Sequence, residues 1–209
     1  MARVTELPAS ADVVAPSAEL VRARLAEAVT VKQQLAMGPC VEQAVQAAQL
    51  MLTCLRGGGK VIFFGNGGSA QDAGHLAAEL MGRFRFDRPG LGAISLPDAT
   101  AAMTAIGNDY DYDEVFARQL VAAGRPGDVA VGLTTSGNSA NVVRALAAGR
   151  QAGLITMVLT GAGGGRAADV AQLTIQVPTL DTARIQEACL HLGHTICEMV
   201  EAALFSPSA

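Results

Sequence analysis

The chain is poor in charged and aromatic residues. Of its 209 residues, 16% are charged and 4% are aromatic, and it has no tryptophan, whereas 50% are hydrophobic. The net charge is -4 and no long basic run occurs, which argues against nucleic acid or an anionic membrane as a partner. An alanine-rich chain with so few charges is typical of helices whose faces are buried between subunits.

Long hydrophobic runs and paired cysteines are also lacking. No stretch is long enough to span a bilayer, and residues 1–20 lack the apolar core of a signal peptide. Four cysteines lie in helix-like segments and form no CxxC pair: Cys40, Cys54, Cys189 and Cys197. We therefore expect reduced, buried thiols in a cytoplasmic protein.

The N-terminal part of the chain has a helical pattern before any strand. Residues 1–15 mix proline, serine and alanine and are predicted to form a flexible arm. Helical periodicity follows over residues 17–37 and 41–55, interrupted at Gly38-Pro39. We interpret these two segments as an N-terminal helical extension, included in a single domain that spans residues 16–205.

Strand-like and helix-like segments then alternate. Short runs rich in β-forming residues occupy residues 61–64, 92–96, 129–133, 155–159 and 173–177. Helical segments are predicted at residues 70–81, 113–123, 138–152, 165–170 and 184–204. Because most of the strands are apolar along their whole length, both of their faces should be buried. The predicted fold is a three-layer α/β sandwich with a five-stranded, mostly parallel sheet.

Two polar loops follow strands of this sheet, where ligands of such folds bind. The first, "GNGGS" at residues 65–69, lets the backbone approach an anion, although a structural turn explains it about equally well. The second, "TTSGNS" at residues 134–139, has four hydroxyls at a helix start, which is more than capping requires. Hydroxyls and helix N–H groups together can hold a phosphate without a lysine.

These loops belong to a set of motifs that carries a family resemblance. The segments "GNGGSAQDAGHLAAEL", "GRFRFDRPG", "AIGNDY", "TTSGNSANV" and "ARIQEACLHLGH" together resemble the phosphoheptose isomerases, or sedoheptulose 7-phosphate isomerases, of the sugar isomerase (SIS) fold family. The resemblance extends over residues 15–204. It implies a homotetramer with active sites shared between subunits, and an enzyme converting D-sedoheptulose 7-phosphate to D-glycero-D-manno-heptose 7-phosphate in nucleotide-activated heptose biosynthesis.

The resemblance also assigns site residues. It implies that Glu79 and His194 are the catalytic pair. It implies a substrate site formed by Asn66, Gly67, Gly68, Glu79, Asn108, Asp109, Thr134, Thr135, Ser136, Ser139 and Gln186, with the four hydroxyl residues on the phosphate. It implies one zinc ion held by His75, Glu79, Gln186 and His194.

Helical spacing is compatible with this ligand set. A separation of four places His75 and Glu79 about 40° apart on one helix face, and a separation of eight places Gln186 and His194 about 80° apart. Two imidazoles, a carboxylate and an amide can bind zinc, but an amide ligand is unusual. From spacing alone, packed or capped histidines are the more common explanation. Arg83 and Arg184 either neutralise substrate charge or form ion pairs.

Other members of the fold family are not enzymes. One relative binds the replication initiator DnaA, and it resembles this chain over the same loops. Glu79 and His194 are both present here, which favours the enzyme over that non-catalytic binding protein. A sugar-phosphate-sensing regulator is a third class, but the first 60 residues contain no basic recognition helix. Ala183 departs from isomerases that have an acidic residue there, which concerns the sugar contacts only.

Overall fold

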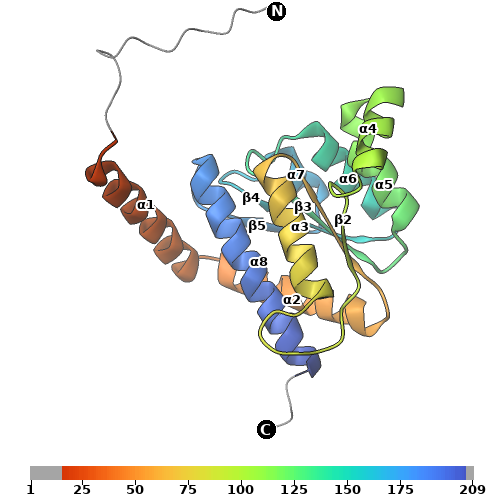
Figure 1. The fold of residues 1–209 in the computed structure, drawn as a ribbon, viewed down its shortest axis with the longest axis horizontal. Helices are drawn as coiled ribbons and strands as arrows, with labels where there is room; N and C mark the ends of the chain where they lie inside the picture. Colours follow the sequence, from red (N-terminus) through yellow and green to blue (C-terminus); the bar gives the residue numbers. More distant parts are fainter. Residues whose placement is uncertain (1–15, 206–209) are drawn as a thin grey trace, which may run out of the picture.

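A five-stranded parallel sheet forms the centre of the protein (Figure 1). The computed structural model describes residues 16–205, so the arm predicted at residues 1–15 lies outside the described residues. The sheet order is β2-β1-β3-β4-β5, and each neighbouring pair is parallel. The strands are β1 (Val61–Gly65), β2 (Ala93–Ser95), β3 (Val129–Thr134), β4 (Ile155–Thr160) and β5 (Leu173–Gln176).

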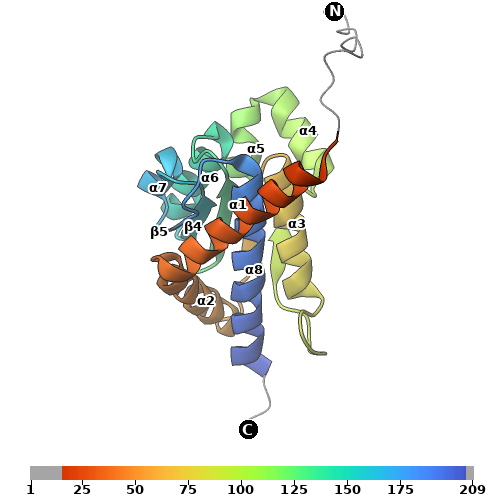
Figure 2. The same cartoon turned by 90° about the vertical axis from the view of Figure 1, so that its left-hand side faces the viewer.

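Helices cover both faces of this sheet, as the three-layer prediction requires (Figures 1 and 2). Phe63 of β1 packs into one core with α2 (Cys40–Arg56), α3 (Gly68–Met81) and α8 (Thr182–Phe205). The next residue, Phe64, packs into a second core with α5 (Val115–Ala123) and α6 (Ala140–Gln151). Successive strand residues point to opposite faces, so a continuous apolar run supplies both cores. The predicted α/β sandwich is confirmed.

The first helix, α1 (Ala18–Met37), has little contact with these cores. Of its apolar side chains, Val31 and Leu35 are buried, whereas Leu20, Val21, Leu25 and Val29 are all more than half exposed. In Figure 2, α1 lies across the outer side of α8. The predicted N-terminal helix is therefore present, and much of its apolar surface is uncovered in a single chain. Within residues 16–205, no helix is both long and apolar enough to span a bilayer.

One helix was not predicted. Helix α4 (Thr100–Asp109) has no side-chain hydrogen bond at its N-cap, Ala99, and none of its residues is fully buried. It therefore lacks a capping side chain, and its apolar residues Met103 and Ile106 are only partly buried against the second core, so the sequence signal for a helix is weak. The segment after it also differs, because a 3₁₀ turn (Tyr112–Glu114) precedes α5. The short helix α7 (Gly165–Val170) lies as predicted.

An ion pair between a buried carboxylate and the partly exposed side chain of Lys60 joins the starts of β1 and β3. The Asp128 carboxylate is 3% exposed and accepts hydrogen bonds from Lys60 Nζ, from Lys60 N at 2.9 Å and from Arg125 N at 2.8 Å. Burial on its own would raise the pKa of the Asp128 carboxyl, but the hydrogen bonds from Lys60 and Arg125 hold it below its usual value. This pair joins the two strands at their N-terminal ends, and the polar loops follow their C-terminal ends.

We predict that Asp128→Asn lowers the free energy of unfolding by about 2–4 kcal/mol at neutral pH, because Lys60 loses its charged partner. A depressed carboxyl pKa stabilises the folded state above the unfolded pKa, and this contribution disappears as the pH falls through the folded pKa. In urea unfolding, the difference between wild type and variant should therefore shrink from about pH 5 toward pH 3. Asp169→Asn, which changes an exposed carboxylate, is the control and should have little effect at any pH. A difference between wild type and Asp128→Asn that does not depend on pH would contradict the prediction.

Candidate active site

The two predicted polar loops lie next to each other. Strands β1 and β3 are adjacent and in register from Val61↔Val129 to Gly65↔Leu133, so the loops that follow them leave the same edge of the sheet. Each loop leads directly into a helix, α3 after β1 and α6 after β3. Two helix N-termini therefore start from neighbouring points, and the positive end of a helix dipole has a favourable potential for an anion.

The hydroxyl loop, residues 134–139, contains hydrogen bonds among its own residues. Thr134 Oγ1 and Ser139 Oγ are 3.1 Å apart, and Asn138 N donates to Ser136 Oγ at 3.1 Å. Ser139 occupies the N-cap of α6, yet its hydroxyl accepts no hydrogen bond from the helix. Capping therefore does not account for these hydroxyls, which line the start of α6 together with its N–H groups. This arrangement can hold a phosphate without a cationic side chain.

The glycine loop, residues 65–69, contains two glycines in different settings. Gly67 has a φ of +59°, which side chains with a Cβ rarely adopt. At Gly68, a Cβ would collide with the side-chain amide of Gln186, which lies directly over the loop. The first turn of α3 and the first turns of α8 therefore meet here, and Gln186 lies against the residues predicted to contact substrate.

Asn66 joins the two loops instead of pointing freely into the site. Its Nδ2 donates to Asn141 Oδ1 at 2.8 Å, and its Oδ1 accepts from Asn141 Nδ2 at 2.9 Å and from the Tyr112 hydroxyl at 3.1 Å. Asn141 is 3% exposed at the start of α6. Sequence reasoning missed Asn141 and Tyr112, although both stand in or beside the motifs "TTSGNSANV" and "AIGNDY".

The end of α4 lies close to this junction. Asn108 and Asp109 are both exposed, and Asn108 Nδ2 donates to Asp109 Oδ1 at 2.8 Å. Three residues after Asp109, the Tyr112 hydroxyl reaches Asn66 and ties the segment to the glycine loop. The unpredicted helix α4 thus ends with this exposed polar pair, and Tyr112 makes the contact with the glycine loop.

Three further groups converge between α3 and α8. His75 Nε2 lies 2.9 Å from His194 Nε2 and 3.1 Å from Glu79 Oε1. The close approach depends on Gly193, where a Cβ would lie 2.6 Å from a δ-carbon of Leu76. His75 is 45% exposed at its side chain and Glu79 is 24% exposed, so the cluster is open to solvent on one side.

This cluster fits a divalent metal. Two imidazole nitrogens and one carboxylate oxygen all lie within 4.8 Å of one another. Ligands about 2.0–2.1 Å from a tetrahedral zinc are about 3.3 Å from each other, close to the separations found here. Three protein ligands and one free position are typical of catalytic zinc. Gln186, the predicted fourth ligand, lies about 12 Å before His194 along α8 and faces Gly68.

Burial determines the protonation of the nearby groups. It lowers the pKa of His194, and the neighbouring His75 lowers it further, so His194 is neutral at neutral pH and can offer a lone pair. Burial also raises the pKa of the Cys189 thiol to about 12. That thiol stays protonated and is not a nucleophile. All four cysteines are buried and unpaired, as predicted.

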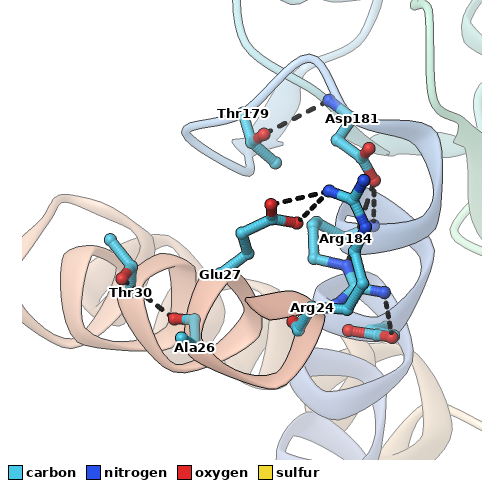
Figure 3. Close-up of polar contacts among 8 residues, drawn as sticks. Arg24, Ala26, Glu27, Thr30, Thr179, Asp181 and Arg184 are labelled. Atoms are coloured by element: carbon cyan, nitrogen blue, oxygen red, sulfur yellow. Dashed lines mark hydrogen bonds and ion pairs between the residues drawn. The ribbon is translucent and has the colours of Figure 1, made fainter. Parts of the chain in front are cut away.

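Arg184 is an ion-pair partner. Its Nη2 lies 2.8 Å from Glu187 Oε1, and its Nη1 donates to the Arg24 carbonyl of α1 at 2.7 Å. Figure 3 shows Arg184 among side chains of α1 and of the segment that begins α8. The alternative in which Arg184 neutralises substrate charge is therefore not favoured. Arg83, by contrast, is exposed after α3 and stays available for that role.

The parallel sheet, the hydroxyl loop and the glycine loop define a sugar isomerase (SIS) domain protein. In agreement, the family model described as "SIS domain" matches residues 39–161. A phosphoheptose isomerase from Rhodospirillum rubrum is 51% identical over 170 residues, which cover 81% of this chain and 90% of that protein. The chain belongs to the phosphoheptose isomerase family.

Solved structures agree with this assignment. The structure of phosphoheptose isomerase GmhA from Neisseria gonorrhoeae has a TM-score of 0.83 and 45% identity, covering 88% of this chain and 98% of its own. A phosphoheptose isomerase from Francisella tularensis has a TM-score of 0.85 and 31% identity, covering 89% and 98%. Both alignments extend over nearly the whole of the relative.

We predict that Gly193→Ala weakens zinc binding about tenfold or more, because the added Cβ pushes α8 away from Leu76 and separates His194 from His75. Isothermal titration of zinc into chelator-treated protein measures this, with one ion per chain expected for the wild type. Gly149→Ala is the matched control, since a Cβ there would lie 2.9 Å from Leu120 in the other core. Equal affinities for both variants would contradict the prediction.

Proposed function

We propose that this chain is an aldose–ketose isomerase that converts D-sedoheptulose 7-phosphate to D-glycero-D-manno-heptose 7-phosphate, in the cytoplasm, as the first step of nucleotide-activated heptose biosynthesis. The observation that carries the proposal is the convergence of Glu79 with two imidazoles beside two anion-compatible loops. Relatives at about half identity are named phosphoheptose isomerases, which supports the same substrate class.

We place the phosphate at the hydroxyl loop and the reacting carbons at Glu79 and His194. From Gly68 to His75 the α3 axis rises by about 10 Å, comparable with the length of an extended seven-carbon sugar phosphate. The phosphate contacts are proposed for Thr134, Thr135, Ser136 and Ser139, and the sugar contacts for Asn66, Gly67, Gly68, Asn108, Asp109 and Gln186. Binding one end of the substrate orients the other end for proton transfer.

In the proposed reaction, the Glu79 carboxylate removes a proton from C1 of the ketose. An enediolate forms, and the same carboxyl returns a proton to C2, giving the aldose. Neutral His194 moves the proton that must leave the C1 hydroxyl and reach the C2 oxygen. Negative charge that develops on these oxygens needs nearby donors, and the two imidazoles are suitably placed.

The residues present fit one zinc ion, with His75, Glu79 and His194 as ligands. When bound, zinc would polarise the substrate oxygens, an effect of several kcal/mol. Glu79 would be a weaker base as a ligand, so its two roles compete. Gln186 joins the ligand set only if its amide leaves Gly68, and we otherwise assign it to the sugar.

We also propose a homotetramer with active sites at subunit interfaces. The exposed apolar residues of α1 and the solvent-open side of the His75–Glu79–His194 cluster both support burial by another subunit.

The alternative is a non-catalytic SIS-domain binding protein, of the type that binds DnaA. Such a protein has no use for a carboxylate and two imidazoles within 4.8 Å of one another, so the cluster favours the enzyme.

Sedimentation analysis tests the tetramer. We predict a particle with four times the mass of the 21.4-kDa chain. Val29→Glu, which places a charge on the exposed apolar face of α1, should dissociate it, whereas Gln33→Glu on the same helix should not. A monomeric wild type would contradict the proposal.

Incubation with sedoheptulose 7-phosphate in deuterated water tests the reaction. We predict deuterium at C2 of an aldoheptose 7-phosphate for the wild type, and a loss of at least about 10³-fold in rate for Glu79→Gln, because the amide cannot accept the proton. Glu42→Gln, at an exposed position of α2, is the control. No product and no exchange from a zinc-loaded, intact oligomer would refute the enzyme and favour the binding protein.

A further inference from the structure

A second ion pair, buried at both partners, lies beside the His75–Glu79–His194 cluster. Arg88, in the connection from α3 to β2, has a side chain 1% exposed, and Glu201 of α8 has a side chain 0% exposed. Arg88 Nε donates to Glu201 Oε1 at 2.9 Å. The same carboxylate accepts from Phe84 N at 2.8 Å and from Arg85 N at 2.6 Å. Burial alone would raise the pKa of Glu201, but these three donors lower it below its usual value, so it remains charged.

The Arg88 guanidinium closes the C-terminal end of α3. Its Nη2 donates to the Glu79 carbonyl at 2.8 Å, and its Nη1 donates to the carbonyls of Leu80 at 2.7 Å and Gly82 at 3.0 Å. The last carbonyls of a helix have no partner within the helix and attract cations. The turn of α3 that carries Glu79 is therefore fastened to α8 through Arg88 and Glu201.

Phe84 connects the same carboxylate to the imidazole of His194. Its backbone N–H donates a hydrogen bond to the Glu201 carboxylate. Its ring stacks on that of His194, with 5.5 Å between ring centroids and 27° between planes. The His75 ring also lies against His194, at 4.9 Å. The Arg85 guanidinium lies 5.0 Å from the Phe84 ring centroid and pairs with Glu198. The imidazole of His194 is thus in contact with both His75 and Phe84.

We propose that Arg88, Glu201 and Phe84 are positioning residues for the isomerase, which set Glu79 and His194 in their productive arrangement. The inference rests on the proposed function, but it concerns residues outside the substrate and metal sites. Replacing a buried ion pair by well-packed apolar residues is often neutral or stabilising, so stability alone does not explain this pair. Here its hydrogen bonds run to the turn that carries Glu79 and to the residue stacked on His194. The pair therefore sets the positions of Glu79 and His194, where a small displacement lowers the rate of catalysis.

Two substitutions remove separate parts of this arrangement. Glu201→Gln keeps the shape but turns one acceptor into an NH₂ group, which then faces the N–H of Phe84 or Arg85. Phe84→Leu removes the stack, and Phe84→Tyr restores it. We expect kcat to fall at least about tenfold for Glu201→Gln and Phe84→Leu, with KM for sedoheptulose 7-phosphate changed less than about twofold. Phe84→Tyr should retain most of the wild-type kcat.

Asp128→Asn is the structural control, since it breaks the other ion pair that has a buried carboxylate, at the N-terminal ends of the strands. It should cost comparable stability but leave kcat per folded enzyme unchanged. Unchanged kcat in Glu201→Gln and Phe84→Leu would overturn the inference, as would an equal loss in Asp128→Asn or no rescue by Phe84→Tyr.

A second readout is independent of the reaction. The chain has three histidines, so the ring C–H signals of His194 can be assigned in an NMR spectrum by their loss in His194→Gln. These signals should shift in Phe84→Leu and Glu201→Gln but not in Asp128→Asn, because the ring of Phe84 no longer lies on the imidazole. Absence of these shifts would overturn the inference. If instead the wild type lacks isomerase activity while the shifts occur, the proposed function fails and the structural arrangement stands.

Discussion

The close packing of α3 against α8 is the contact on which the site depends. Leu76 and Gly193 let the two helices approach so nearly that His75 and His194 touch. Nearer their N-terminal ends, the same helices meet again where Gln186 covers Gly68. The glycine loop and the His75–Glu79–His194 cluster are therefore two ends of one helix pair, and any change in its packing alters both.

The chain has few charged residues, and its buried carboxylates lie away from the two polar loops. We propose that the loops after β1 and β3 bind the phosphate through hydroxyls and helix N–H groups, an arrangement that requires no lysine. Two carboxylates that are almost completely buried are each paired with a cation, Asp128 with Lys60 at the N-terminal ends of β1 and β3 and Glu201 with Arg88 at the end of α3. Each pair saturates its carboxylate with backbone N–H groups, which makes a buried charge tolerable and holds chain segments in place.

Much of the fold could be predicted because its signals are local. Continuous apolar runs revealed the five strands, and the four-residue spacing placed His75 and Glu79 on one helix face. The contact of His75 with His194 spans 119 positions and depends on Gly193, so spacing alone could only suggest it. Family resemblance supplied that pairing. The resemblance did not supply the position of Gln186 in this chain, which is over Gly68.

The missed features have a common cause. Helix α4 has no capping side chain and no fully buried residue, so nothing local marks it. Asn141, Tyr112 and Phe84 matter through partners distant in the chain: the first two meet Asn66, and Phe84 meets His194 and Glu201. Such contacts cannot be predicted from local sequence patterns, because only the folded chain brings the partners together.

A crystal structure of the Glu79→Gln variant with sedoheptulose 7-phosphate would test the central claim most directly, because the substrate would bind without reacting. The account predicts phosphate oxygens within hydrogen-bonding distance of Ser136 and Ser139, with C1 and C2 beside position 79 and His194. A phosphate bound at His75 and His194, or a sugar bound away from the helix pair, would contradict it.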